Sequence, residues 1–160
     1  MTTSSDLIRA ARLGLGSTLD GRPKRRLAVV TCMDARVDPW RLLRAGVGDM
    51  HVIRNAGGVV TDDVIRSLSV STMRFGTNQV QLVMHTDCGM LGFDESSFRR
   101  DMQDMAGMPP PWPMMGFDDL EAEVARGVDL LRSSPMLTAV ERISGHVFDV
   151  RTGRMETVAA

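Results

Sequence analysis

The stretch Leu27–Pro39, LAVVTCMDARVDP, is the most informative part of the sequence for the fold. Its first five residues are apolar or β-branched with no polar alternation, a pattern typical of a strand buried on both faces of a parallel sheet. A cysteine, Cys32, follows directly. Asp38 and Pro39 then form an N-cap followed by proline at the first helical position. The stretch therefore predicts a buried strand that leads into a cysteine, with a short helix shortly after it.

The rest of the chain repeats this alternation of strands and helices. Further strands are expected at Met50–Arg54, Gln79–Met84 and Val147–Val150, with an edge strand after a turn at Thr152-Gly153; helices are expected at Leu7–Leu15, Thr61–Gly76, Asp94–Met105 and from Phe117 to about Leu131. Strands alternating with helices indicate right-handed βαβ units. We therefore predict an α/β fold: a mostly parallel central β-sheet flanked by helices, with an N-terminal helical arm. The proline-rich loop Gly107–Gly116 is expected to be a connector or a subunit contact.

Length and composition restrict the class of protein. The chain has 160 residues, 43% of them hydrophobic, which suits a single domain spanning residues 1–160 with a substantial core. Its net charge of −1 argues against nucleic acid or a membrane as the main partner. No apolar run approaches the roughly 18 residues of a membrane span, and the N-terminus MTTSSDLIRAARLGLG lacks a signal-peptide core. We therefore expect a cytoplasmic protein whose thiols stay reduced.

The only two cysteines point to a metal site. Cys88 lies in HTDCG, three residues after His85, directly beyond a predicted strand. Cys32, the turn Asn55–Gly58 and the segment His85–Cys88 all follow strands, and the carboxyl ends of parallel strands meet at one edge of a sheet. Two thiolates and one imidazole are donors that zinc prefers. Three protein ligands leave one position open, as in catalytic zinc sites, so we predict that Cys32, His85 and Cys88 bind one Zn²⁺.

Two charged residues follow the first cysteine at alternate positions. Asp34 is close enough in sequence to Cys32 to reach the open metal position or a water bound there. Arg36 can hold the Asp34 carboxylate by a bidentate ion pair. An unrestrained carboxylate would bind the metal and displace the water, whereas a clamped one can orient the water. Asp34 and Arg36 are therefore the predicted catalytic residues.

Each of these features has an ordinary explanation when it is taken alone. Cys32 can be a small buried apolar residue, and Asp34 and Arg36 can form a surface ion pair. His51 and His146 lie within strand patterns, where packed and hydrogen-bonded side chains are expected. The basic run 22–26 is expected to be a solvated linker rather than a targeting or phosphate-binding patch. The combination at matching strand ends is what favours a metal centre.

The motifs CMDAR, RNAGG and HTDCG resemble those of the β-class carbonic anhydrases, in the same order and with similar separations. The resemblance covers residues 26–92 strongly and 143–156 moderately, and it is closest to the compact prokaryotic branch. It implies that Cys32, His85 and Cys88 are zinc ligands, with Asp34 and Arg36 beside the zinc-bound water. It also implies homodimers or dimers of dimers whose N-terminal helix embraces the partner, with active sites at the subunit interface.

The implied reaction is attack by zinc-bound hydroxide on CO₂, giving bicarbonate and a proton. Val59, Val60 and Met84 are candidates for the substrate pocket. The same branch also resembles hydrolases of carbonyl sulfide and carbon disulfide with an equivalent zinc site, and the motif residues do not separate these activities. A third alternative, from another class, is a non-enzymatic zinc or redox module that uses Cys32 and Cys88 as a dithiol pair.

Overall fold

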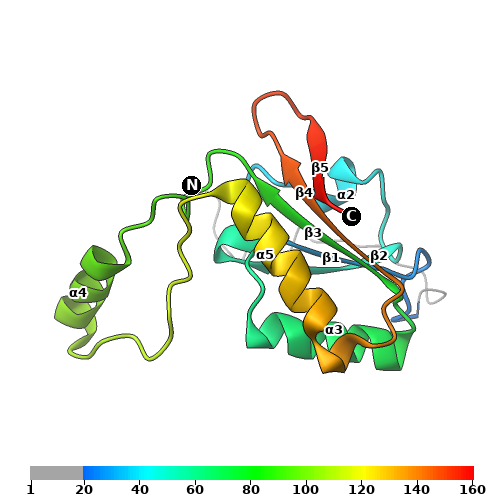
Figure 1. Cartoon of the computed structure of the whole chain (residues 1–160), viewed down its shortest axis with the longest axis horizontal. Helices are drawn as coiled ribbons and strands as arrows, with labels where there is room; N and C mark the ends of the chain where they lie inside the picture. The colour runs from blue at the N-terminus through cyan, green and yellow to red at the C-terminus, as the bar shows by residue number, and fades with distance from the viewer. Residues whose placement is uncertain (1–19) are drawn as a thin grey trace, which may run out of the picture.

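The predicted mostly parallel sheet is present in the computed structural model, which describes residues 20–160 (Figure 1). Five strands form one sheet in the order β2-β1-β3-β4-β5, and all neighbours are parallel except β4 and β5. The strands are β1 (Leu27–Cys32), β2 (Met50–Asn55), β3 (Gln79–His85), β4 (Arg142–Phe148) and β5 (Met155–Ala159). The helix predicted for residues 7–15 lies outside the described residues.

The sequence pattern of β1 explains its place inside the sheet. All six of its residues are buried, as the run without alternation predicts. It pairs with β2 on one side and β3 on the other. In this register Cys32 lies opposite Asn55, while Thr31 lies opposite Val83, two residues before His85. The carboxyl ends of three strands therefore meet at one edge of the sheet.

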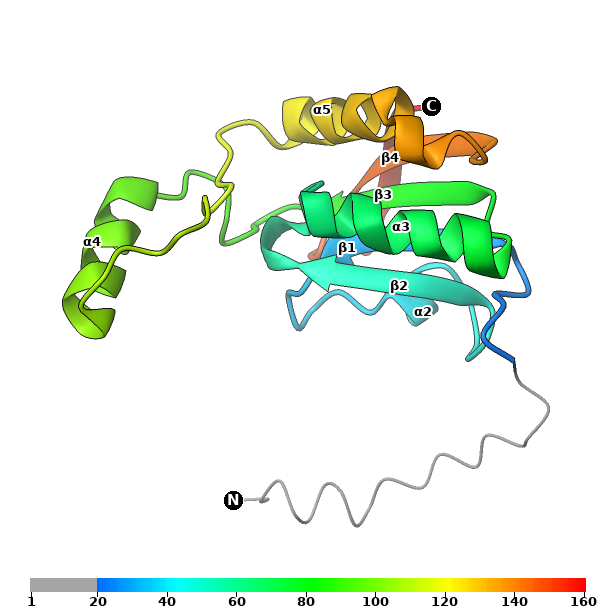
Figure 2. The same ribbon diagram turned by 90° about the horizontal axis from the view of Figure 1, so that it is seen from below.

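Helices cover both faces of the sheet (Figure 2). The longer helices α3 (Asp62–Phe75) and α5 (Leu120–Ser133) lie on one face and close the larger apolar core. The short α2 (Pro39–Leu42) lies on the other face, where Leu42 packs against a smaller cluster around β1 and β2. The predicted N-caps are confirmed, since the side chains of Asp38 and Thr61 accept backbone N–H groups of α2 and α3. Gly76 ends α3 with a φ of 73°, as predicted.

The strand predicted at Val147–Val150 is wrong in its bounds, because β4 begins at Arg142 and ends at Phe148. Ser144, Gly145 and His146 interrupt the apolar pattern and conceal the first half of the strand. The glycine is required by helix packing: a Cβ on Gly145 would lie 2.5 Å from Val124 Cγ1. Close contact between α5 and the sheet therefore explains why the strand signal is weak.

Helix α4 (Glu95–Ala106) confirms the helix predicted at Asp94–Met105, and it projects from the body of the protein (Figures 1 and 2). The proline-rich loop returns along it, and Arg99 donates to the carbonyls of Pro110 and Trp112. Two 3₁₀ turns, η1 (Ala56–Gly58) and η2 (Pro135–Leu137), complete the architecture. Within residues 20–160, no helix is both long enough and apolar enough to span a membrane.

Candidate metal centre

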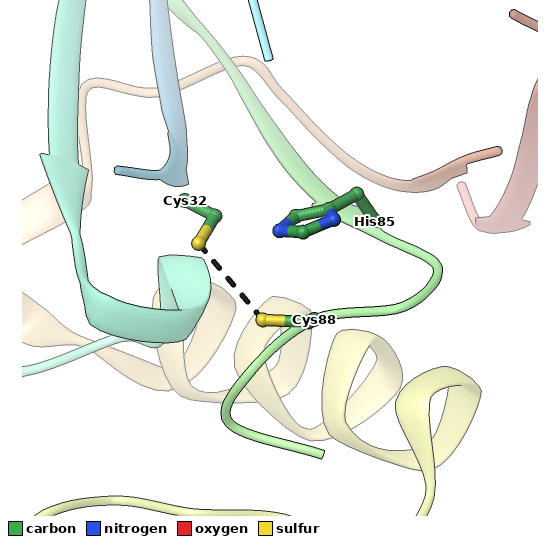
Figure 3. Close-up of side chains that lie close together, drawn as sticks. All are labelled: Cys32, His85 and Cys88. Atoms are coloured by element: carbon green, nitrogen blue, oxygen red, sulfur yellow. Dashed lines mark hydrogen bonds between the residues drawn. The ribbon is translucent and has the colours of Figure 1, made fainter. Parts of the chain in front are cut away.

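The structure brings the three predicted ligands together at the carboxyl edge of the sheet (Figure 3). Cys32 is the last residue of β1, His85 is the last residue of β3, and Cys88 lies in the turn that follows. The potential ligand atoms all lie within 4.8 Å of one another, and the two Sγ atoms are 3.9 Å apart. All three side chains are buried. This arrangement can hold a metal ion.

The hydrogen bonds of His85 leave one ring nitrogen free for such an ion. Its Nδ1 lies 2.8 Å from the carbonyl oxygen of Thr86, which can only accept, so Nδ1 carries the proton and donates. In that tautomer Nε2 carries the lone pair of the ring. It is buried and has no hydrogen-bond partner among residues 20–160. A buried nitrogen without a partner is costly, and metal ligation would satisfy it.

The two thiols are also placed in a way that suits a cation. Burial raises the pKa of the Cys88 thiol to about 11, and the neighbouring Cys32 acts in the same direction. Without a cation the thiol is therefore protonated at neutral pH. A divalent cation favours the thiolate and releases the proton. Two sulfurs and one imidazole nitrogen match the donor set that zinc prefers, and the chain fits this metal.

Asp34 and Arg36 form the predicted ion pair beside this cluster. Arg36 donates from Nε to Asp34 Oδ1 at 3.0 Å and from Nη2 to Oδ2 at 2.8 Å. The Arg36 backbone N–H also donates to Oδ1. These hydrogen bonds hold the pKa of the Asp34 carboxyl well below its usual range, and they raise the pKa of the Arg36 guanidinium. Asp34 is therefore ionised at neutral pH, and both of its oxygens are engaged by arginine.

Two residues at the site were not singled out by sequence analysis. Asp87 accepts a hydrogen bond from Arg36 Nη1 to its Oδ2 at 2.6 Å, and its carbonyl accepts one from Nη2 at 2.8 Å. Arg54 donates to the carbonyls of Cys32 and Asp34, at 2.9 and 2.7 Å. The motifs that contain Asp87 and Arg54 were recognised, but contacts between segments so far apart in the chain leave no periodic signal in a single sequence.

The turn η1 after β2 lies against Cys32, the first of the predicted metal ligands. Gly58 has a φ of 71°, and a Cβ at this position would lie 2.8 Å from the backbone nitrogen of Cys32. Only glycine combines this conformation with this approach at no steric cost. Next to it, Val59 and Val60 belong to the same buried cluster as Cys32 and Cys88. The site therefore adjoins the apolar core of the protein.

Other features that were considered as alternatives have structural roles. His51 lies within hydrogen-bond distance of Ser71 Oγ and the Gly21 carbonyl, as the packed interpretation predicts. His146 contacts Ser144 Oγ and Thr157 Oγ1 in the same manner. In the basic run, Arg25 donates to the carbonyls of residues 43 and 44, and Arg26 donates to that of residue 76. The basic residues of this run are exposed, as the prediction of a solvated linker requires, and these two arginines also tie the start of β1 to the body.

Comparison with known proteins shows what the sequence and the fold are similar to. The family model described as carbonic anhydrase matches residues 27–108. The chain is 43% identical over 145 residues to β-carbonic anhydrase 1 of Mycobacterium tuberculosis, a match that covers 91% of this chain and 89% of that protein. It is 36% identical to a carbon disulfide hydrolase of Acidianus sp., covering 82% of this chain and 76% of that protein. The solved carbonic anhydrase of Streptococcus mutans superposes with a TM-score of 0.90, at 37% identity and 99% coverage of both chains.

Proposed function

The chain belongs to the β-carbonic anhydrase family, and from this premise we propose that it is a zinc enzyme that reversibly hydrates CO₂ to bicarbonate and a proton. The single observation that carries the proposal is the buried, unpartnered Nε2 of His85 among residues 20–160, beside two buried thiols. Cys32, His85 and Cys88 would hold the metal. When bound, zinc supplies the Lewis acidity that makes water nucleophilic at neutral pH.

In this proposal Asp34 orients the reacting water. Its Oδ2 lies 3.8 Å from His85 Nε2, so the carboxylate faces the metal ligands. Because it is ionised, it can accept a hydrogen bond from the water and fix the direction of the remaining lone pairs. Arg36 donates to both carboxylate oxygens. That grip keeps Asp34 from turning to occupy the fourth ligand position itself.

The apolar core beside the site favours a small, uncharged substrate. Val59, Val60 and Met84 are at most 5% exposed and share the buried cluster of Cys32 and Cys88. We propose that this apolar cluster borders the place where a linear, nonpolar molecule lies near the water held by Asp34. Bicarbonate, which is charged and strongly hydrated, gains less from such a surface, and its release is favoured.

A second candidate function is hydrolysis of carbonyl sulfide or carbon disulfide. The 36% sequence identity between this chain and the carbon disulfide hydrolase of Acidianus sp. favours the hydrolysis of carbon disulfide. The three substrates are linear molecules with one electrophilic carbon, so the same water, carboxylate and metal ligands serve each of them. Sulfur is larger and less polar than oxygen, and discrimination would therefore depend on the shape of the apolar access route.

We infer that residues 1–160 form one zinc domain, that the chain assembles as a homodimer or a dimer of dimers, and that it works in the cytoplasm. The side chain of Met33, between Cys32 and Asp34, is 66% exposed, which supports coverage of the site by a second copy. A reducing compartment keeps Cys32 and Cys88 available as thiolates.

Stopped-flow measurement of CO₂ hydration by zinc-loaded protein tests the proposal. Release of hydrogen sulfide from carbonyl sulfide and from carbon disulfide is measured on the same preparation. We expect CO₂ hydration to dominate; faster sulfide release would favour the second candidate. If protein with about one zinc per chain showed none of the three activities, an enzymatic role would be contradicted. The non-enzymatic zinc or redox module would then be the remaining alternative.

A further inference from the structure

We propose that Asp87 is a positioning residue that fixes the Arg36 guanidinium, and through it the Asp34 carboxylate, relative to the turn that carries Cys88. The inference rests on the proposed function, because it assigns a role within the same site. Asp87 touches neither substrate nor metal in this role. It acts through Arg36.

The contacts of Arg36 join two segments that are far apart in the chain. Asp34 lies two residues away and accepts from Nε and Nη2. Asp87 is 51 residues away and accepts from Nη1 through its carboxylate and from Nη2 through its carbonyl. Four hydrogen bonds thus hold one planar group from two directions. A planar guanidinium held in this way cannot turn without breaking several of them.

The local pair alone cannot set the geometry of the site. Asp34 and Arg36 lie in one loop, whose backbone Arg54 holds through the Asp34 carbonyl. The two paired side chains can still change position together without losing their mutual hydrogen bonds. The contact with Asp87 connects that loop to the segment between His85 and Cys88. This contact therefore adds a side-chain restraint on where the Asp34 carboxylate lies relative to the ligands on the other strand.

The backbone at Asp87 supports a role for its side chain. Its φ of 55° lies in the left-handed region, where aspartate and asparagine are tolerated better than most residues. Glycine would adopt this conformation at no steric cost but would offer no carboxylate. The 2.6 Å hydrogen bond to Arg36 gives the carboxylate a function that glycine lacks.

The decisive variant is Asp87→Asn in the full-length, zinc-loaded protein. Asparagine keeps the shape and tolerates the same φ, and the carbonyl anchor remains, so the change removes only the charge. A second variant, Asp87→Gly, relieves the backbone and removes the side chain entirely. The control is Asp63→Asn, which neutralises another exposed ion pair, with Arg66 at 2.7 Å, on helix α3.

The first readout is the mobility of Arg36. The Nε–H signal of Arg36 in a ¹H–¹⁵N NMR spectrum, identified by its loss in Arg36→Lys, reports how firmly the guanidinium is held. We expect faster side-chain motion in Asp87→Asn and Asp87→Gly, and no change in Asp63→Asn. This readout needs no turnover, so it remains informative even if the protein proves inactive toward CO₂.

The second readout is kinetic. We expect kcat for CO₂ hydration to fall about two- to fivefold in Asp87→Asn, since the Asp87 and Arg36 side chains are 74% and 47% exposed and water screens the pair. The KM, the zinc content and the melting temperature should stay at wild-type values, and Asp87→Glu should recover part of the rate. Unchanged Arg36 mobility would overturn the proposal, as would lost zinc or a melting temperature lowered more than in Asp63→Asn.

Discussion

The Asp34 carboxylate and the His85 imidazole face each other across the site, with Oδ2 of Asp34 3.8 Å from Nε2 of His85. Both groups offer a lone pair toward the site. Asp34 is ionised because Arg36 holds it, and Nε2 of His85 carries a lone pair because Nδ1 donates to the Thr86 carbonyl. A cation ligated by that nitrogen would therefore lie near a carboxylate that is ready to orient a water.

Asp34→Asn should leave the metal site intact while removing the acceptor that orients the water. We expect zinc to remain at about one per chain and CO₂ hydration to fall by about 10²- to 10⁴-fold, the range for loss of a positioned acid or base. Stopped-flow assay and elemental analysis of the same sample measure both quantities. If the variant kept its rate within a few fold of wild type, Asp34 would have no catalytic role.

Cys88→Ser should remove a ligand with little change in side-chain volume. A serine hydroxyl is a much poorer zinc ligand than a thiolate. We expect the zinc affinity to fall by more than about 100-fold, beyond the loss typical of residues that only orient ligands. Competition with a chromogenic chelator measures the affinity, and circular dichroism checks the fold. An affinity equal to wild type in a folded variant would exclude Cys88 from the ligand set.

Gly58→Ala tests the contact between the turn after β2 and the first cysteine. Gly107→Ala is its matched control, because Gly107 has a similar φ of 74° but nothing within 4 Å of a Cβ. We expect the control to cost about 1–2 kcal/mol, the strain of a left-handed alanine. Gly58→Ala should cost more and also weaken zinc binding, since its Cβ would meet the Cys32 backbone.

Urea unfolding measures both free energies, and the chelator assay measures zinc binding. Equal losses of stability in the two variants, with zinc binding unchanged in both, would show that the close approach to Cys32 has no energetic importance.

The stability of the protein should depend on pH through His146. Burial lowers the pKa of this histidine below its usual value of 6.5. The unfolded chain therefore binds a proton more readily than the folded one as the pH falls through that region. The contribution of His146 to the free energy of unfolding is therefore fully present above about pH 6.5, and it is lost as the pH falls below that value.

His146→Gln removes this titration, so its free energy of unfolding should decline less between about pH 6.5 and 5 than that of wild type. Urea unfolding at several pH values gives the two slopes. Identical slopes would contradict the assignment. Subtracting one protein from the other removes the contribution of groups that both share.

The cluster of Cys32, His85 and Cys88 could be predicted because these residues lie at or just beyond strand ends. Cys32 follows an uninterrupted apolar run, and His85 and Cys88 share one turn, so a parallel sheet places them together. The start of β4 could not be predicted because packing against α5 requires Gly145. Small residues weaken the apolar, β-branched pattern by which a strand is predicted. Asp87 and Arg54 were missed because their importance lies in contacts with a loop brought close only by the folded chain.

The central claim is that Cys32, His85 and Cys88 bind one zinc ion and leave a position open beside Asp34. Zinc K-edge X-ray absorption of the metal-loaded protein tests it most directly. We predict two sulfur neighbours at about 2.3 Å and two nitrogen or oxygen neighbours at about 2.0–2.1 Å, one of which exchanges with added anions. A spectrum with fewer than two sulfurs, or with four protein ligands and no exchangeable neighbour, would contradict the claim.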